Sequence, residues 1–206
     1  MDAAFLVTAF ATLFVVIDPI GLTPVFIALT QGATGAHRRV LALRACAIAA
    51  AILLLFTFFG EAVLGFIGIS MSAFRIAGGI LLFITALDML FERRSKRRED
   101  KAGEDGALPD PSVFPIAIPL IAGPGAIATM ILLAGQTTDA LGIAAVIGVM
   151  LSVVAMVLLL FLTAGLIERA LGHTGIVVVT RLLGMLLAAL SVQFVIDGVR
   201  HIAVSG

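Results

Sequence analysis

The chain contains no tryptophan and no tyrosine, and only one of its 206 residues is a cysteine. A single cysteine cannot form a disulfide within the chain or run a dithiol relay, which excludes membrane thiol-exchange enzymes. The aromatic belts of many membrane proteins need Trp and Tyr, so phenylalanine must serve at the interfaces here. Charged residues make up only 13% of the chain, and they form no basic, aromatic-interleaved surface for nucleic acid.

Apolar residues dominate the composition of the chain. They make up 61% of the chain, and the mean hydropathy is +1.21, so the apolar runs require lipid around them. Runs of about 20 apolar residues are typical of transmembrane helices. Because residues 1–31 lack the basic stretch and cleavage site of a signal peptide, we expect the first span to be retained. The sequence predicts an all-α integral membrane protein with six spans, near residues 4–31, 40–60, 72–91, 113–135, 141–167 and 178–199.

The second half of the chain repeats the first. FRIAGGILLF from Phe74 recurs 106 positions later as TRLLGMLLAA, which aligns Arg75 with Arg181. PIGLTPVFIAL from Pro19 likewise lies 105 residues before PGAIATMILLA from Pro124. Because a unit of three spans crosses the membrane an odd number of times, the two copies should be inverted, as in many secondary transporters.

The positive charges predict the orientation. If the N-terminus lies outside, eleven of the thirteen Lys and Arg residues fall on the cytoplasmic side, and only Arg75 and Arg200 remain outside. The opposite topology would reverse this ratio, so we expect both termini outside. The polar stretch 92–112 is then a flexible cytoplasmic linker between a first repeat, 1–91, and a second, inverted repeat, 113–206.

Two of the expected spans contain helix-breaking residues near their middle. DPIGLTP at 18–24 places two prolines and a glycine in the first span, and AGPGAIAT at 122–129, with Pro115 and Pro119 before it, does so in the fourth. A helix break frees N–H and C=O groups from their partners in the helix. In lipid, such a break is tolerated only where protein, water or a substrate forms hydrogen bonds with these groups. Interrupted helices at corresponding positions of inverted halves therefore predict a binding site at the midplane.

Asp18 is the only carboxylate deep within an expected span. Its burial costs on the order of a few kcal/mol unless it is paired, hydrated or protonated, so one explanation is a substrate ammonium or a carried proton. The other explanation is that Asp18 caps the resumed half-helix through the N–H groups freed by the break. One carboxylate can do both.

Three neutral polar residues are further candidates for substrate contact. Thr23 and Thr129 follow the two breaks and can offer hydroxyl groups, although threonines in helices commonly bond to their own backbone. Gln193, inside the last span, needs amide partners from another helix or from a substrate.

The remaining polar residues have simpler interpretations. Arg75 and Arg181 begin the third helix of each repeat and are expected to reach the interface as anchors. Asp88 and Asp197 lie in last turns near water, with a gating pair to a nearby arginine as the alternative. Gly184 permits close helix packing. The three histidines lack the spacing of a metal site.

Five motifs extend along the whole chain: DPIGLTPVF from Asp18, FRIAGGILLF from Phe74, PLIAGPGAI from Pro119, TRLLGMLL from Thr180 and VQFVIDG from Val192. In this order, within six spans, they resemble the MarC family of inner-membrane proteins, also called the small neutral amino acid transporter family. The resemblance implies a bacterial or archaeal cytoplasmic (inner) membrane. For some members it implies ion-coupled uptake of small neutral amino acids such as glycine and alanine.

The residues and the resemblance together predict an alternating-access transporter with its site at the two breaks. The carboxylate of a zwitterionic amino acid would lie on the N–H groups where the resumed fourth helix begins, and its ammonium would face Asp18. Glycines lining that space allow close backbone approach and leave room only for small substrates. The expected substrate-binding residues are Asp18, Pro19, Gly21, Thr23, Gly123, Pro124, Gly125, Thr129 and Gln193.

Two alternatives stay open on the sequence alone: a transporter or exporter of another small solute or a drug, and a structural or regulatory membrane protein that transports nothing. Few buried acids and no His or Cys cluster disfavour a metal carrier. No nucleophile and base occur at a spacing that suits an enzyme. We expect no cofactor beyond a coupling ion, either a proton or sodium. The expected partners are the small-molecule substrate and the lipid bilayer, and a homo-oligomer stays open.

Overall fold

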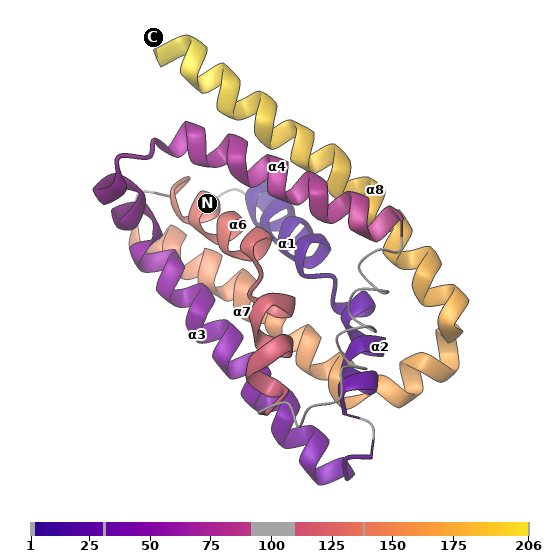
Figure 1. The fold of residues 1–206 in the computed structure, drawn as a ribbon. Coiled ribbons are helices and arrows are strands. Elements are labelled where there is room, and N and C mark those ends of the chain that lie inside the picture. Colours follow the sequence, from indigo (N-terminus) through magenta and orange to yellow (C-terminus); the bar gives the residue numbers. More distant parts are fainter. Residues whose placement is uncertain (1–2, 31, 92–109, 138, 206) are drawn as a thin grey trace.

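The computed structural model describes residues 3–30, 32–91, 110–137 and 139–205, and every regular element within them is a helix (Figure 1). Most of the predicted linker, 92–109, lies outside the described residues. The first half contains α1 (Ala3–Ile17), α2 (Pro19–Leu29), α3 (Gly35–Ile67) and α4 (Met71–Leu90). The second half contains η1 (Ser112–Ile121), α6 (Pro124–Ala134), α7 (Ala140–Leu162) and α8 (Ala164–Ser205).

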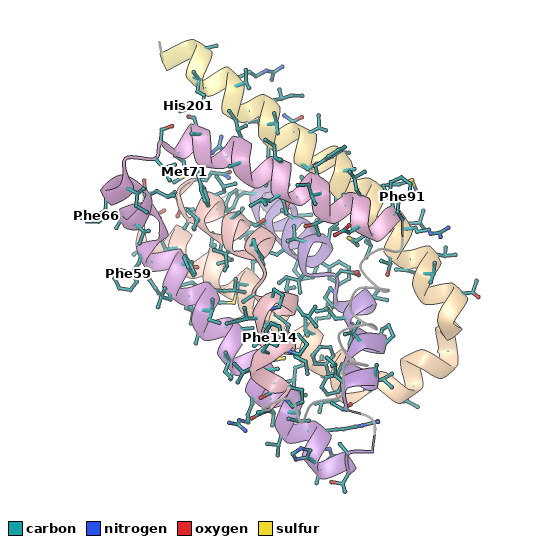
Figure 2. All side chains as sticks on the ribbon, in the orientation of Figure 1. Phe59, Phe66, Met71, Phe91, Phe114 and His201 are labelled. Atoms are coloured by element: carbon teal, nitrogen blue, oxygen red, sulfur yellow. The ribbon has the colours of Figure 1, made fainter. Side chains whose placement is uncertain are left out.

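The described helices are long and apolar enough to cross a membrane. Five stretches meet this condition within the described ranges: Ala3–Leu29, Gly35–Ile67, Met71–Leu90, Ala140–Leu162 and Val177–Ala203. The pair η1 and α6, bent by 54° at the break between them, forms a sixth span when counted as one. Large apolar side chains point outward, and Phe59 and Phe66 are 60% and 93% exposed (Figure 2). Such a surface suits lipid, and the expected all-helical integral membrane protein is confirmed.

Local sequence determines where the helices begin and end. Thr34 and Ser70 accept hydrogen bonds from the N–H groups of His37 and Ala73, at 3.3 and 3.2 Å, and so cap the first turns of α3 and α4. Gly68 ends α3 with φ 82°, a left-handed conformation that glycine adopts without strain. The chain can therefore turn sharply from α3 into α4.

The helices α4 and α8 lie side by side and run in opposite directions (Figure 1). A Cβ atom at Gly79 on α4 would lie 2.8 Å from the Ser191 carbonyl oxygen. Closer to the start of α4, a Cβ atom at Gly198 on α8 would lie 3.0 Å from the Ser72 carbonyl oxygen. Glycines on both helices thus let the two backbones approach closely.

The buried core is centred on α1 and α6. Ala9, Leu13 and Met130 have no exposed surface, and α3, α4, α7 and α8 surround them (Figure 1). Phe26 of α2 stacks on Phe161 of α7, with ring centroids 4.2 Å apart and ring planes 5° apart. This contact holds the second half of the first span against α7.

The chain between the fifth and sixth spans differs from the prediction. The sequence predicts a fifth span to residue 167, but α7 ends at Leu162. The first part of α8 follows, and the chain turns at Gly172, with φ 61° and ψ 174°, before the sixth span begins at Val177. Residues 164–167 are all apolar or glycine, so composition alone cannot show that the span has already ended.

Candidate binding site at two helix breaks

The first span breaks at Asp18. This residue has a left-handed backbone, with φ 55° and ψ 64°, and it precedes Pro19, the first residue of α2. Aspartate tolerates this conformation better than most residues because its short polar side chain can bond locally. The side chain is 1% exposed, and Oδ1 accepts a hydrogen bond of 3.0 Å from the Gly21 N–H. Asp18 is therefore the N-cap of α2, as one of the two interpretations of the sequence requires.

The break is shorter than the sequence predicts. The motif favours an interruption across 18–24, but Asp18 alone separates α1 from α2. Pro19 occupies the first helical position, where no N–H is needed. Pro24 lies inside α2 and costs it one backbone hydrogen bond. Phe26, which is 2% exposed and stacks on α7, helps to hold α2 in place despite that loss.

The Asp18 carboxylate lies against the first turn of α2. A Cβ atom at Gly21 would be only 2.7 Å from Asp18 Cγ, so a larger residue could not fit without moving the carboxylate. Thr23 is fully buried, and its Oγ1 donates to the Pro19 carbonyl oxygen at 3.1 Å. That bond uses the hydroxyl hydrogen and leaves the hydroxyl oxygen able to accept.

The fourth span breaks at Gly123. The preceding segment η1 is irregular, because Phe114 and Ile118 have extended backbones, each before a proline. Gly123 is the N-cap of α6, and Pro124 is its first residue. A Cβ atom at Gly123 would lie 2.5 Å from the Pro119 carbonyl oxygen, so only glycine fits where the chain folds back.

The two breaks share a plan and differ in one respect. Each leads into a half-helix of 11 residues that begins with a proline and contains a buried threonine. Thr129 Oγ1 donates to the Gly125 carbonyl oxygen at 2.8 Å, much as Thr23 bonds in α2. At the N-cap, however, Asp18 supplies a carboxylate, whereas Gly123 makes no side-chain cap. The positive end of the α6 dipole is therefore not neutralised by its own N-cap residue.

The two breaks lie at the same level of the bundle. A Cβ atom at Gly125 on α6 would be 3.3 Å from Val16 Cγ1 on α1 and 2.9 Å from Leu82 Cδ2 on α4. Asp18 follows Val16 by two residues and Gly123 precedes Gly125 by two, so both breaks lie close to this contact between α1 and α6. The sequence predicts an open space beside Gly125, but Val16 and Leu82 fill that position.

Gln193 lies away from the breaks. It is exposed on α8, and its Nε2 donates to Asp197 Oδ1 at 2.8 Å. Both residues line a cavity of about 260 Å³ at the end of the bundle where α1 begins, together with Arg75, Thr12 and Gln136. Of these residues, the sequence predicts a binding role for Gln193 and an interface anchor for Arg75. The antiparallel pairing of α4 with α8 is the feature that brings Arg75 and Asp197 to the same cavity.

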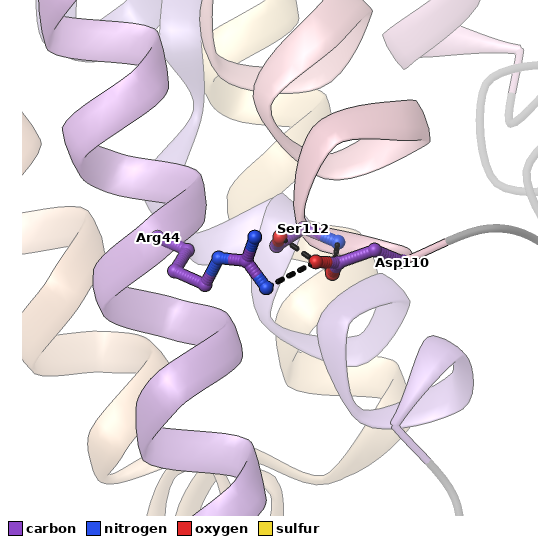
Figure 3. A network of polar contacts seen from close by, with 3 residues as sticks. All are labelled: Arg44, Asp110 and Ser112. Carbon is purple, nitrogen blue, oxygen red and sulfur yellow. Dashed lines mark hydrogen bonds and ion pairs between the residues drawn. The ribbon is translucent and has the colours of Figure 1, made fainter.

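At the other end of the bundle, charged groups form a small network between α3 and η1 (Figure 3). Asp110 pairs with Arg44 through Oδ2 and accepts bonds from Ser112 through Oδ1, at 2.6 Å from Oγ and 3.2 Å from N. The Ser112 hydroxyl, helped by the Ser112 N–H and the Arg44 charge, holds the pKa of Asp110 below its ordinary value although partial burial opposes this. Among all the residues described, no three His, Cys, Asp or Glu side chains come together as a metal site requires.

Known proteins resemble this chain over nearly its whole length. The family described as "MarC family integral membrane protein" matches residues 3–203. A protein of Archaeoglobus fulgidus named "UPF0056 membrane protein" is 38% identical over 98% of this chain and 95% of its own. "UPF0056 membrane protein YvbG" of Bacillus subtilis is 36% identical over 97% and 96%. "UPF0056 inner membrane protein YhgN" of Escherichia coli is 33% identical over 95% and 96%.

These similarities determine the family and leave the activity to be argued from the site. The relatives include archaeal and bacterial proteins, and their names give a membrane location without an activity. No solved structure matches the chain. The matched region extends from the first span to the last and includes both helix breaks, so the resemblance in the motifs is confirmed. The chain belongs to the MarC family of multi-pass integral membrane proteins.

Proposed function

We propose that the protein is a secondary transporter of small neutral amino acids, such as glycine and alanine, which works by alternating access around the two helix breaks. The observation that supports this most directly is the placement of two half-helix N-termini at one level of the bundle. One N-terminus bears a buried carboxylate, and the other has no side-chain cap from its own N-cap residue. A zwitterion has the two charges that such a pair can bind.

The substrate carboxylate binds at the start of α6. The first N–H groups of a helix have no acceptor within it, and the positive end of the helix dipole favours an anion. The substrate ammonium binds to the carboxylate of Asp18, which can accept several hydrogen bonds at once and takes one of them from the Gly21 N–H. The tight packing around Gly123 and Gly125 favours a small side chain on the substrate.

Alternating access follows from the repeat. The antiparallel packing of α4 on α8 supports two inverted three-helix repeats, 1–91 and 113–206, that rock against each other. The distribution of basic residues supports outside termini and a cytoplasmic 92–112 linker, in a bacterial or archaeal cytoplasmic membrane. The coupling ion, a proton or sodium, is bound near Asp18, the one acid at the breaks.

Uptake of radiolabelled glycine and alanine into proteoliposomes tests the proposal. We expect accumulation under a proton or sodium gradient, and exchange of internal for external substrate without one. A well-folded protein that takes up neither amino acid under any gradient would contradict the proposal.

A further inference from the structure

We propose that the cavity bounded by Arg75, Gln136, Gln193 and Asp197 is a second binding site, which receives a small zwitterionic solute before it reaches the helix breaks. We name it the N-terminal cavity, because it lies where α1 begins, among side chains of α1, α4, α6 and α8. Its role as the way to the breaks rests on the proposed function. Its ability to bind such a solute is argued from its own charges and size.

The N-terminal cavity has one group of each charge. Arg75 comes from α4 and Asp197 from α8, and both side chains are half-buried. They line the same cavity without forming an ion pair with each other, and Arg75 bonds to no other residue in the described ranges. Gln193 holds Asp197 in place through the bond of 2.8 Å to Oδ1. A carboxylate on Arg75 and an ammonium on Asp197 would bridge the two walls.

The size and lining of the N-terminal cavity fit a small hydrophilic solute. A volume of about 260 Å³ holds roughly nine water molecules. Gln136 and Gln193 are exposed at its mouth, whereas Thr12 and Leu133, at 3% and 5% exposure, form its floor. Amide and hydroxyl groups around two opposite charges favour a zwitterion over a lipid chain.

The N-terminal cavity leads toward the breaks. Thr12 on its floor precedes Asp18 by six residues on the same helix, which is about 9 Å along α1. Leu13, Val16 and Leu82 pack in this interval and are at most 3% exposed, so they close the path in the conformation seen here. Movement of α4 against α1 and α6 would open it, as a rocking of the two repeats requires.

Cysteine protection in lipid nanodiscs tests the inference. Cys46, the single native cysteine, is replaced by alanine, and Thr8→Cys places a thiol on the cavity lining. We expect glycine to slow its reaction with a water-soluble maleimide several-fold. Acetate and methylamine, which each have only one of the two charges, should protect less. In Arg75→Gln and in Asp197→Asn, protection should need at least about tenfold more glycine, the effect of losing one charge-assisted bond.

Two matched variants serve as controls. Arg200→Gln removes a positive charge at the same end of the bundle but outside the cavity lining, so glycine should still protect Thr8→Cys. Arg75→Lys keeps the charge and should keep most of the protection. If Arg75→Gln fails to fold, Arg75→Lys and Asp197→Asn still decide the question.

The outcomes separate this inference from the proposed function. Equal labelling with and without glycine, protection that survives both Arg75→Gln and Asp197→Asn, or acetate acting as well as glycine would each overturn the cavity site. Uptake into proteoliposomes is measured in parallel. Uptake without protection would contradict the cavity site but agree with the transport function. Protection without uptake would contradict the transport function but agree with the cavity site.

Discussion

Asp18 and Gly123 occupy the same position at the start of two half-helices, 105 residues apart in the sequence. Each is an N-cap followed by a proline, but only Asp18 bonds to the first turn of its helix. Two identical caps would make a site for a symmetrical ligand. One acidic cap beside one uncapped helix end instead suits a ligand with a positive and a negative group.

Asp18→Asn should separate the charge from the cap. Asparagine is as good an N-cap as aspartate and also tolerates the left-handed conformation, so the melting temperature in detergent should stay close to wild type. Uptake of glycine should fall about tenfold or more, because a charge-assisted bond of about 1.5–3 kcal/mol is lost. Asp18→Ala should also lose the cap and about 1 kcal/mol of stability. Melting curves and uptake rates measured on the same preparations check both expectations.

Asp139→Asn is the matched control. Asp139 is the exposed N-cap of α7 and makes no side-chain cap bond, so its replacement should leave uptake unchanged. If Asp18→Asn transported glycine as well as Asp139→Asn does, Asp18 would be a structural cap alone.

Gly21→Ala should disturb Asp18 without changing its charge. The added methyl group overlaps the carboxylate, so the cap must move, and both uptake and melting temperature should fall. Gly148→Ala on α7 is the comparison, because nothing lies within 4 Å of its Cβ position. That variant should be as stable as wild type or up to about 1 kcal/mol more stable, since alanine favours a helix. Equal behaviour of the two variants would show that the carboxylate does not lie where the structure has it.

Local sequence features predicted both breaks, because their causes are local. A proline cannot continue a preceding helix and fits its first turn, which locates the breaks just before Pro19 and Pro124. Contacts between distant segments could not be predicted in this way. The sequence does not show that Gly125 faces Val16, because that depends on which helices become neighbours.

The N-terminal cavity was missed for the same reason. Arg75 and Asp197 lie in different repeats. Alone, Arg75 has the sequence context of an interface anchor, and Asp197 that of a last turn near water. Only the antiparallel register of α4 and α8 makes them lie around one cavity. The repeat contains a signal for such pairing, since inverted copies bring equivalent helices together in opposite directions.

Reporter fusions should show the N-terminus and C-terminus outside and the 92–112 linker in the cytoplasm, because only two of thirteen basic residues would then lie outside. Alkaline phosphatase fused to the C-terminus should be active, and the same enzyme inserted in the linker should be inactive. The reverse pattern would overturn the orientation. Equal activity at both places would put the linker and the C-terminus on the same side of the membrane, which would contradict two inverted three-span repeats.

The Arg44–Asp110 pair should give stability that depends on pH. The Ser112 hydroxyl, together with the Ser112 N–H and the Arg44 charge, lowers the pKa of Asp110 in the folded protein. These contacts therefore stabilise the fold above the ordinary carboxyl value of about 3.9, and the effect is lost as the pH falls through the lowered value. The difference in melting temperature between wild type and Asp110→Asn should therefore be present at neutral pH and disappear in acid. High salt should reduce it, since Arg44 is 57% exposed. A difference that is independent of pH would exclude ionisation of Asp110 as its cause.

Three glycine-to-alanine variants should rank the helix contacts. At Gly184 the new methyl group would lie 3.0 Å from Met89 Cβ, close to a backbone that cannot yield, so the α4–α8 contact should lose about 1–3 kcal/mol. At Gly125 the nearest atom is Cδ2 of Leu82, the end of a flexible side chain, so the loss should be smaller. Gly65 has nothing within 4 Å, and Gly65→Ala should not lower the melting temperature. Thermal unfolding in one detergent compares all three, and a Gly184→Ala protein as stable as Gly65→Ala would show that α4 and α8 do not pack in this register.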